Sequence, residues 1–187
     1  GKNINADKII DAISMDDLGK PGNLGISRDA WLAQSSTKLR EDRMESADLI
    51  SGSKFYHGSY DKFDVGQVLT PREDQYEENW GANNWYQALE EHRPPAYLQH
   101  SRSVFMVGND DDIDVAGGAT DYVYEVQPVG NVERHDLNWA SEISYLFDAG
   151  HDEDSDAIKE AALNYWKGVP HHNESVWEYL APEVKIV

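Results

Sequence analysis

Residues 55–69 read Phe55-Tyr56-His57-Gly58-Ser59-Tyr60-Asp61-Lys62-Phe63-Asp64-Val65-Gly66-Gln67-Val68-Leu69. The pattern predicts a short strand that ends in a histidine, then a Gly-Ser turn, then a second apolar stretch. Because glycine has no side chain, the backbone beside the His57 ring is open to close approach by a ligand. This arrangement suits a nucleotide pocket. The alternative interpretation is a core histidine at a strand end before a turn.

The chain on either side of this stretch differs in pattern. Residues 1–54 are predicted to form a helical N-terminal extension, because apolar residues recur there at helical spacing and Ser27 can act as an N-cap. From residue 55 onward, short apolar or alternating runs predict strands at 103–107, 121–127, 175–180 and 184–187. We therefore expect an α+β domain with a mainly β core over residues 55–187.

One helix is predicted between these strands. Ser155 is its expected N-cap and Gly168 its stop signal. The residues expected to face inward are Ile158, Ala161, Ala162, Tyr165 and Trp166. The polar and aromatic stretch from Thr70 to Gln99 has two interpretations, a functional loop or a covering helix around residues 84–91.

Composition excludes several classes of function. The 187 residues include 35 Asp and Glu against 16 Lys and Arg, for a net charge of -19. Phosphate contacts need clustered basic side chains, so direct nucleic-acid binding is not expected, and neither is binding to an anionic membrane surface. The charge suggests a basic protein partner, or a protein that mimics nucleic acid. The absence of cysteine fits a reducing, cytoplasmic compartment.

The common cofactor and metal motifs are missing. The sequence contains neither a Gly-x-Gly-x-x-Gly fingerprint nor a P-loop, so a Rossmann or P-loop nucleotide site is unsupported. No metal site is predicted: the acidic clusters at 110–114 and 152–156 lack the calcium-loop pattern, and His171-His172 is interpreted as a solvated turn.

What remains is a set of residues at strand ends. His57, the pair Arg102-Ser103 that leads into the strand of Phe105, and Glu178 would converge only if their strands are neighbours. A histidine for a ribose hydroxyl, an aromatic ring for a flat base and a carboxylate near a developing cation would together suit glycosyl transfer.

Four segments in order, residues 55–69, 102–107, 122–138 and 176–187, resemble the ADP-ribosyltransferase superfamily. They are most similar to the small bacterial rifampin-type enzymes and their phage relatives. The resemblance covers about residues 55–187. It implies a split, strongly twisted β core that clasps NAD+ in a cleft, with NAD+ as the donor substrate and no metal.

The resemblance also implies roles for single residues. His57 would hold the NAD+ ribose and Gly58 would offer its backbone to the nicotinamide amide, with Tyr56 and Ser59 in the same binding segment. Arg102 would contact phosphate, with Ser103 beside it. Phe105 stands where the family often has a stacking tyrosine, which keeps the ring and loses a hydroxyl. The position of the catalytic carboxylate in most members of the family corresponds to Glu178, and its position in the rifampin-type members corresponds to Asp136. We favour Glu178.

The sequence thus predicts a mono-ADP-ribosyltransferase that modifies a basic, nucleic-acid-associated protein and releases nicotinamide. The resemblance allows a phage or toxin effector, which would act in a host cytoplasm. One alternative is an acidic, non-catalytic inhibitor or DNA mimic that blocks a basic groove, and it predicts no NAD+ site. Another is a degenerate transferase fold that binds without catalysis. A single cleft that holds His57, Phe105 and Glu178 would favour the transferase over the inhibitor.

Overall fold

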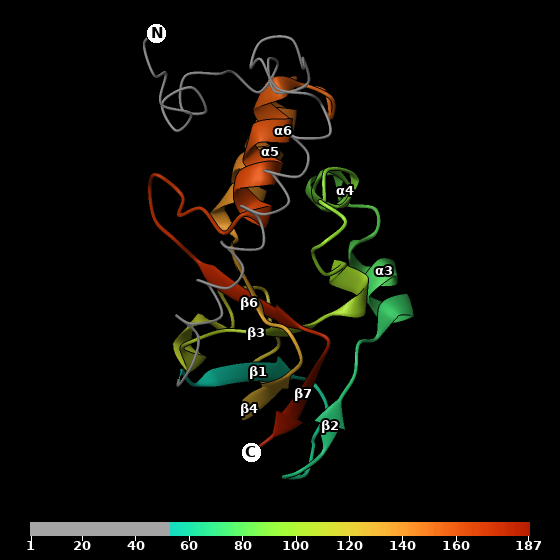
Figure 1. Ribbon diagram of the computed structural model, residues 1–187, viewed down its shortest axis with the longest axis vertical. Coiled ribbons are helices and arrows are strands. Elements are labelled where there is room, and N and C mark those ends of the chain that lie inside the picture. The colour runs from blue at the N-terminus through green and yellow to red at the C-terminus, as the bar shows by residue number, and fades with distance from the viewer. Residues whose placement is uncertain (1–52) are drawn as a thin grey trace, which may run out of the picture. The chain divides into compact units, whose positions relative to one another are not determined.

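The computed structural model describes residues 53–187 (Figure 1). The helical extension predicted for residues 1–54 lies outside this range, apart from its last two residues. The described part combines helices with two antiparallel sheets, so the predicted α+β class is confirmed. Within residues 53–187, no helix combines the length and the apolar character needed to cross a membrane.

The larger sheet has four strands in the order β1-β4-β7-β2. Its strands are β1 (Phe55–Ser59), β4 (Tyr122–Val129), β7 (Glu183–Ile186) and β2 (Val68–Leu69). Each neighbouring pair is antiparallel. On β4 the residues Val123, Glu125 and Gln127 are exposed and Val126 is buried, which is the alternation that the sequence predicts. The strand continues to Val129, beyond the predicted end at residue 127.

The smaller sheet has the order β3-β6-β5. Its strands are β3 (Val104–Met106), β6 (Trp177–Ala181) and β5 (Glu133–Asp136). Phe105 lies opposite Leu180, and Glu178 lies opposite His135. Since side chains alternate along a strand, Phe105, Leu180 and Glu178 point to the same face of this sheet.

Four α-helices occur in the described part. They are α3 (Glu73–Trp80), α4 (Asn84–Glu91), α5 (Asn138–Asp148) and α6 (Asp156–Trp166), with short 3-10 turns η3 (His100–Arg102) and η4 (Asp110–Asp112). Helices α5 and α6 pack against each other at one end of the described part, and the four-stranded sheet lies at the other, with β3 and β6 between them (Figure 1).

Helix α6 forms as predicted. Ser155 accepts a hydrogen bond from the backbone N–H of Ile158, the five expected inward residues are all buried, and Gly168 adopts a positive φ of 68° just after the helix. The covering-helix interpretation of residues 84–91 is also confirmed by α4. Helix α5, which precedes α6, was not predicted.

The apolar core lies between the two sheets. Its buried members come from six strands of both sheets and are Phe55, Leu69, Val104, Met106, Val126, Ala181, Val184 and Ile186. The ring of Phe55 meets the ring of Tyr179 edge-on at 5.0 Å between centroids. This packing fixes β1 of one sheet against β3 and β6 of the other, and so sets the spacing of the residues that these strands carry.

Candidate functional site

A cleft of about 980 Å³ opens where the two sheets meet α3 and the segment around residues 113–119. His57 from β1, Phe105 from β3 and Glu178 from β6 all line it. Tyr56, Gly58, Ser59 and Ser103 line it as well. The sequence names these seven residues as candidates, and the structure brings them to one cavity of a size usual for ligand sites.

His57 is oriented by a backbone hydrogen bond. Its Nδ1 lies 2.7 Å from the carbonyl oxygen of Phe105, so Nδ1–H donates and Nε2 remains available for another partner. Burial lowers the pKa of His57, with Arg72 adding to the effect against the opposing hydrogen bond to Phe105. The half-buried imidazole is therefore neutral at neutral pH. The predicted strand end at His57 is wrong, because β1 continues through Gly58 and Ser59, which pair with β4, and His57 is its middle residue.

Gly58 is required by the packing of the chain itself. A Cβ at this position would lie 2.0 Å from the carbonyl oxygen of Ala119 and 2.6 Å from Cγ2 of Ile113. The close approach that the sequence analysis expected from a ligand is thus made by the segment around residue 119. Gly58 still lines the cleft, but this contact alone accounts for the glycine.

Phe105 already has a stacking partner. The ring of Tyr76 from α3 lies parallel to it, with 5.3 Å between centroids and 4° between planes. A flat ligand ring could stack on this face of Phe105 only if Tyr76 moved. Helix α3 contains no fully buried residue, and its shift would separate the Tyr76 ring from those of Phe105, His100 and Tyr86.

Glu178 is a buried carboxyl group in the wall of the cleft. Its residue is 6% exposed, and Oε2 lies 3.2 Å from the hydroxyl of Tyr165. Burial raises the pKa of Glu178 to about 8, against the opposing effect of the Tyr165 hydrogen bond. A carboxyl group with a raised pKa in a cleft is a typical feature of functional sites.

Asp136, the other candidate carboxylate, does not line the cleft. It accepts hydrogen bonds from the backbone N–H groups of Asn138, His171 and Val176 at 2.8–3.1 Å. These contacts join β5 to the start of α5 and to the loop before β6. The arrangement supplies a structural role for Asp136 that needs no ligand.

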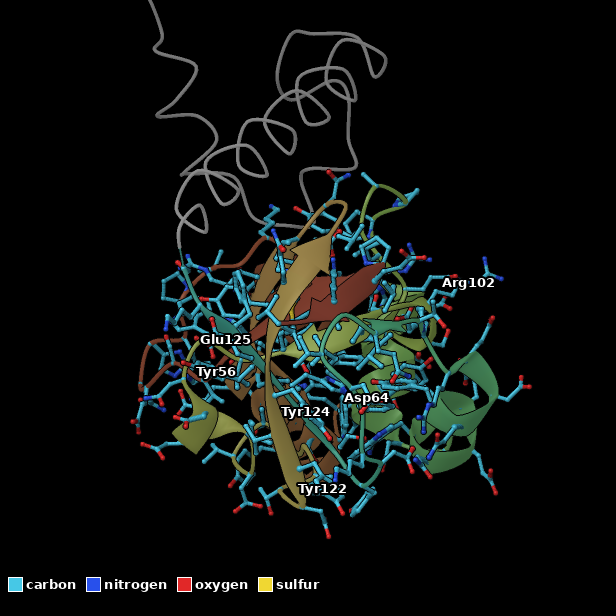
Figure 2. All side chains as sticks on the ribbon, turned by 90° about the horizontal axis from the view of Figure 1, so that it is seen from below. Tyr56, Asp64, Arg102, Tyr122, Tyr124 and Glu125 are labelled. Carbon is cyan, nitrogen blue, oxygen red and sulfur yellow. The ribbon has the colours of Figure 1, made fainter. Side chains whose placement is uncertain are left out.

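Arg102 also lies apart from the cleft. Its side chain is 66% exposed, its Nε lies 3.3 Å from Glu73 Oε1, and it projects from the periphery, away from Tyr56 (Figure 2). Arg72 is the one Lys or Arg among the described residues that line the cleft. It pairs with Asp61 at 2.8 Å, and both side chains are 55% exposed. Sequence reasoning missed Arg72, because Thr70-Pro71 before it reads as an ordinary loop.

One group of side chains elsewhere has ligating atoms close together. The ligand atoms of Glu142, His171 and His172 all lie within 4.8 Å of one another. His171 Nδ1 accepts from the backbone N–H of Asn173, so Nε2 carries the proton and donates to Glu142 at 3.2 Å. This hydrogen bond accounts for the cluster without a metal ion, and the cluster does not line the cleft.

Comparison with protein-family models and with curated proteins found no match to this sequence. The case for any function therefore rests on the geometry of the cleft.

Proposed function

We propose that this chain is a mono-ADP-ribosyltransferase, which takes ADP-ribose from NAD+ and attaches it to a side chain of a basic protein. The observation that carries the proposal is the meeting of His57, Phe105 and Glu178 in one cleft. These residues come from three strands of two sheets, and nothing in their local sequence requires them to be neighbours. Their convergence supports a shared chemical role over three separate structural ones.

Each residue has a role in this proposal. The free Nε2 of His57 hydrogen bonds to a ribose hydroxyl, and its neutral ring does not repel the cationic nicotinamide. The ring of Phe105 stacks on nicotinamide once Tyr76 has moved aside. Arg72, rather than Arg102, contacts the pyrophosphate from the open side of the cleft.

Glu178 acts on the transition state. The bond between nicotinamide nitrogen and ribose C1′ breaks with both electrons leaving on nicotinamide, and C1′ becomes oxocarbenium-like. An ionised Glu178 stabilises this positive charge electrostatically. The acceptor atom of the target protein then bonds to C1′ and releases a proton. Because the charge hardly exists in the ground state, Glu178 should affect kcat far more than NAD+ affinity.

The test uses NAD+ labelled in its adenylate half, together with a cell lysate that supplies acceptor proteins. The expected result is label on protein with wild-type chain and almost none with Glu178→Gln. Binding of NAD+ without label or nicotinamide release would support the degenerate, non-catalytic alternative. No binding of NAD+ by calorimetry would reject the transferase, and the net charge of -19 would then favour the acidic inhibitor.

A further inference from the structure

A chain of hydrogen bonds runs inward from Glu178. The hydroxyl of Tyr165 lies 3.2 Å from Glu178 Oε2 and 2.6 Å from His100 Nε2. His100 Nδ1 lies 2.7 Å from Glu90 Oε1, which also accepts the backbone N–H of His100. The four side chains come from β6, α6, η3 and α4, and they form one continuous path between two carboxyl groups.

The protonation states of the four side chains determine which group donates and which accepts in each hydrogen bond. Burial lowers the pKa of His100, so the imidazole is neutral, and Nδ1–H donates to Glu90. Although burial opposes it, hydrogen bonds from His100 and Arg93 hold the pKa of Glu90 low, so Glu90 is ionised. His100 Nε2 must then accept the Tyr165 proton. The Tyr165 hydroxyl donates to Glu178 Oε2 when Glu178 is ionised. With its proton on His100 Nε2 it accepts instead from the protonated carboxyl group, the form that the raised pKa of Glu178 favours at neutral pH.

The groups that surround this chain of hydrogen bonds leave its net charge negative. Tyr76 from α3 and Tyr86 from α4 both have pKa values raised by burial and stay neutral. Glu133 and His135 from β5 hydrogen bond to each other at 3.1 Å, and the His135 ring stacks on Tyr165 at 4.6 Å. Arg93 neutralises part of the Glu90 charge through a contact of 2.9 Å. Within the described residues, the charge nearest to His100 is therefore the carboxylate of Glu90.

We propose that Tyr165, His100 and Glu90 form a proton relay that takes the proton from Glu178 when a cation enters the cleft, and returns it when the cation leaves. The proposal rests on the proposed function, because the nicotinamide ring of NAD+ is such a cation. The relay explains how a carboxyl group that is neutral in the empty cleft becomes a carboxylate without losing its proton to solvent.

In the transfer two protons move, and each crosses a single hydrogen bond. The O–H bond of Glu178 breaks and its proton bonds to the Tyr165 oxygen, while the original Tyr165 proton bonds to His100 Nε2. Glu178 becomes a carboxylate that accepts from Tyr165, and His100 becomes an imidazolium that donates to both Tyr165 and Glu90. The four groups carry one negative charge before and after the step. In this step Glu178 is the group that stabilises the cation, and Tyr165, His100 and Glu90 act through it as positioning residues, although His100 also lines the cleft.

The first test needs no ligand. In protein labelled with ¹⁵N on histidine, NMR follows His100 Nε2 as the pH rises from 6 to 10. When Glu178 ionises near pH 8, the Tyr165 proton turns from His100 to the carboxylate, so the Nε2 signal should move downfield in one step. Glu178→Gln and Tyr165→Phe should abolish the step. The control Tyr86→Phe should keep it, since this hydroxyl donates to Glu77.

The second test adds the cation. At pH 7, 1-methylnicotinamide should give His100 a second ring proton, whereas neutral nicotinamide should not. A Nε2 signal that stays flat from pH 6 to 10 in folded wild-type protein would overturn the relay. So would binding of the cation with His100 still neutral. If the step near pH 8 is present but the cation does not bind, the relay exists and the proposed NAD+ site is what fails.

Discussion

Asp136 and Glu178 are both buried carboxyl groups of the small sheet, yet their surroundings differ. Three backbone N–H groups donate to Asp136, which satisfies a carboxylate and gives it a structural role. Glu178 faces the cleft and meets a single tyrosine hydroxyl, so burial dominates and its pKa rises to about 8. The sequence shows two acidic residues near strand ends, and only the packing around them separates their roles.

The raised pKa of Glu178 predicts how stability changes with pH. In the folded protein this group keeps its proton up to about pH 8, whereas in the unfolded chain it loses the proton near its ordinary value of 4.5. The folded state thus binds more protons between these values, and its stabilising effect is lost as pH rises toward 8. The free energy of unfolding should fall by about 1 kcal/mol between pH 7 and 9, relative to Glu178→Gln.

Urea unfolding of both proteins at pH 7 and 9 measures this difference. The buried histidines His57 and His100 have lowered pKa values, so their own contribution is complete above pH 6.5 and does not change over this range. An identical pH dependence of wild type and Glu178→Gln would show that the carboxyl group titrates normally.

The two arginines give a matched pair for the phosphate contact. Arg72→Ala should raise KM for NAD+ by about tenfold, because an arginine hydrogen bond to an anion contributes about 1.5 kcal/mol or more. Arg102→Ala should leave KM unchanged, since Arg102 lies away from the cleft and pairs with Glu73. Steady-state kinetics of nicotinamide release measures both. The opposite pattern would return the phosphate contact to Arg102.

At the scale of elements, the helices differ in how much of the sequence pattern that predicts them lies within their own residues. Helix α6 could be predicted because its cap, its apolar spacing and its stop glycine all lie between Ser155 and Gly168. The start of α5 is marked by Asp136, whose carboxylate accepts the N–H of Asn138, and sequence analysis considered Asp136 as a catalytic residue instead. Helix α3 has no buried residue, so it carries no apolar stripe to detect.

The same contrast applies to the site. Three of its residues could be proposed from strand ends, but Glu90, His100 and Tyr165 meet Glu178 only through the packing of four elements. Tyr165 was predicted to be a core residue and is one, with no exposed surface. From the sequence one can infer only that the buried hydroxyl of this tyrosine needs a hydrogen-bond partner, and the sequence does not identify that partner.

The N-cap of α6 can be tested on its own. Ser155→Ala should lower the free energy of unfolding by about 0.5–1 kcal/mol, because the N–H of Ile158 loses its side-chain acceptor. Ser155→Asp should retain most of the stability, since aspartate caps equally well. Thermal unfolding compares the three proteins, and equal stability of wild type and Ser155→Ala would mean that the 3.4 Å contact contributes nothing.

At the scale of the whole molecule, the net charge disfavours the anionic ligand that the cleft is proposed to bind. A net charge of -19 opposes an anionic dinucleotide at long range, so the proposed NAD+ binding would depend on local contacts from Arg72, His57 and the aromatic wall of the cleft. In the proposed transferase, the same charge would favour a basic acceptor protein. Both features fit a transferase that recognises its donor by shape and its target by charge.

The rate of nicotinamide release from NAD+ tests the central claim most directly. The wild-type chain should release nicotinamide, Glu178→Gln should be slower by roughly a hundredfold with NAD+ affinity retained, and His57→Ala should be inactive while folded. Glu160→Gln, which removes an exposed carboxylate of α6, should match wild type. Equal rates for wild type, Glu178→Gln and His57→Ala, or no release by the wild type, would contradict the account.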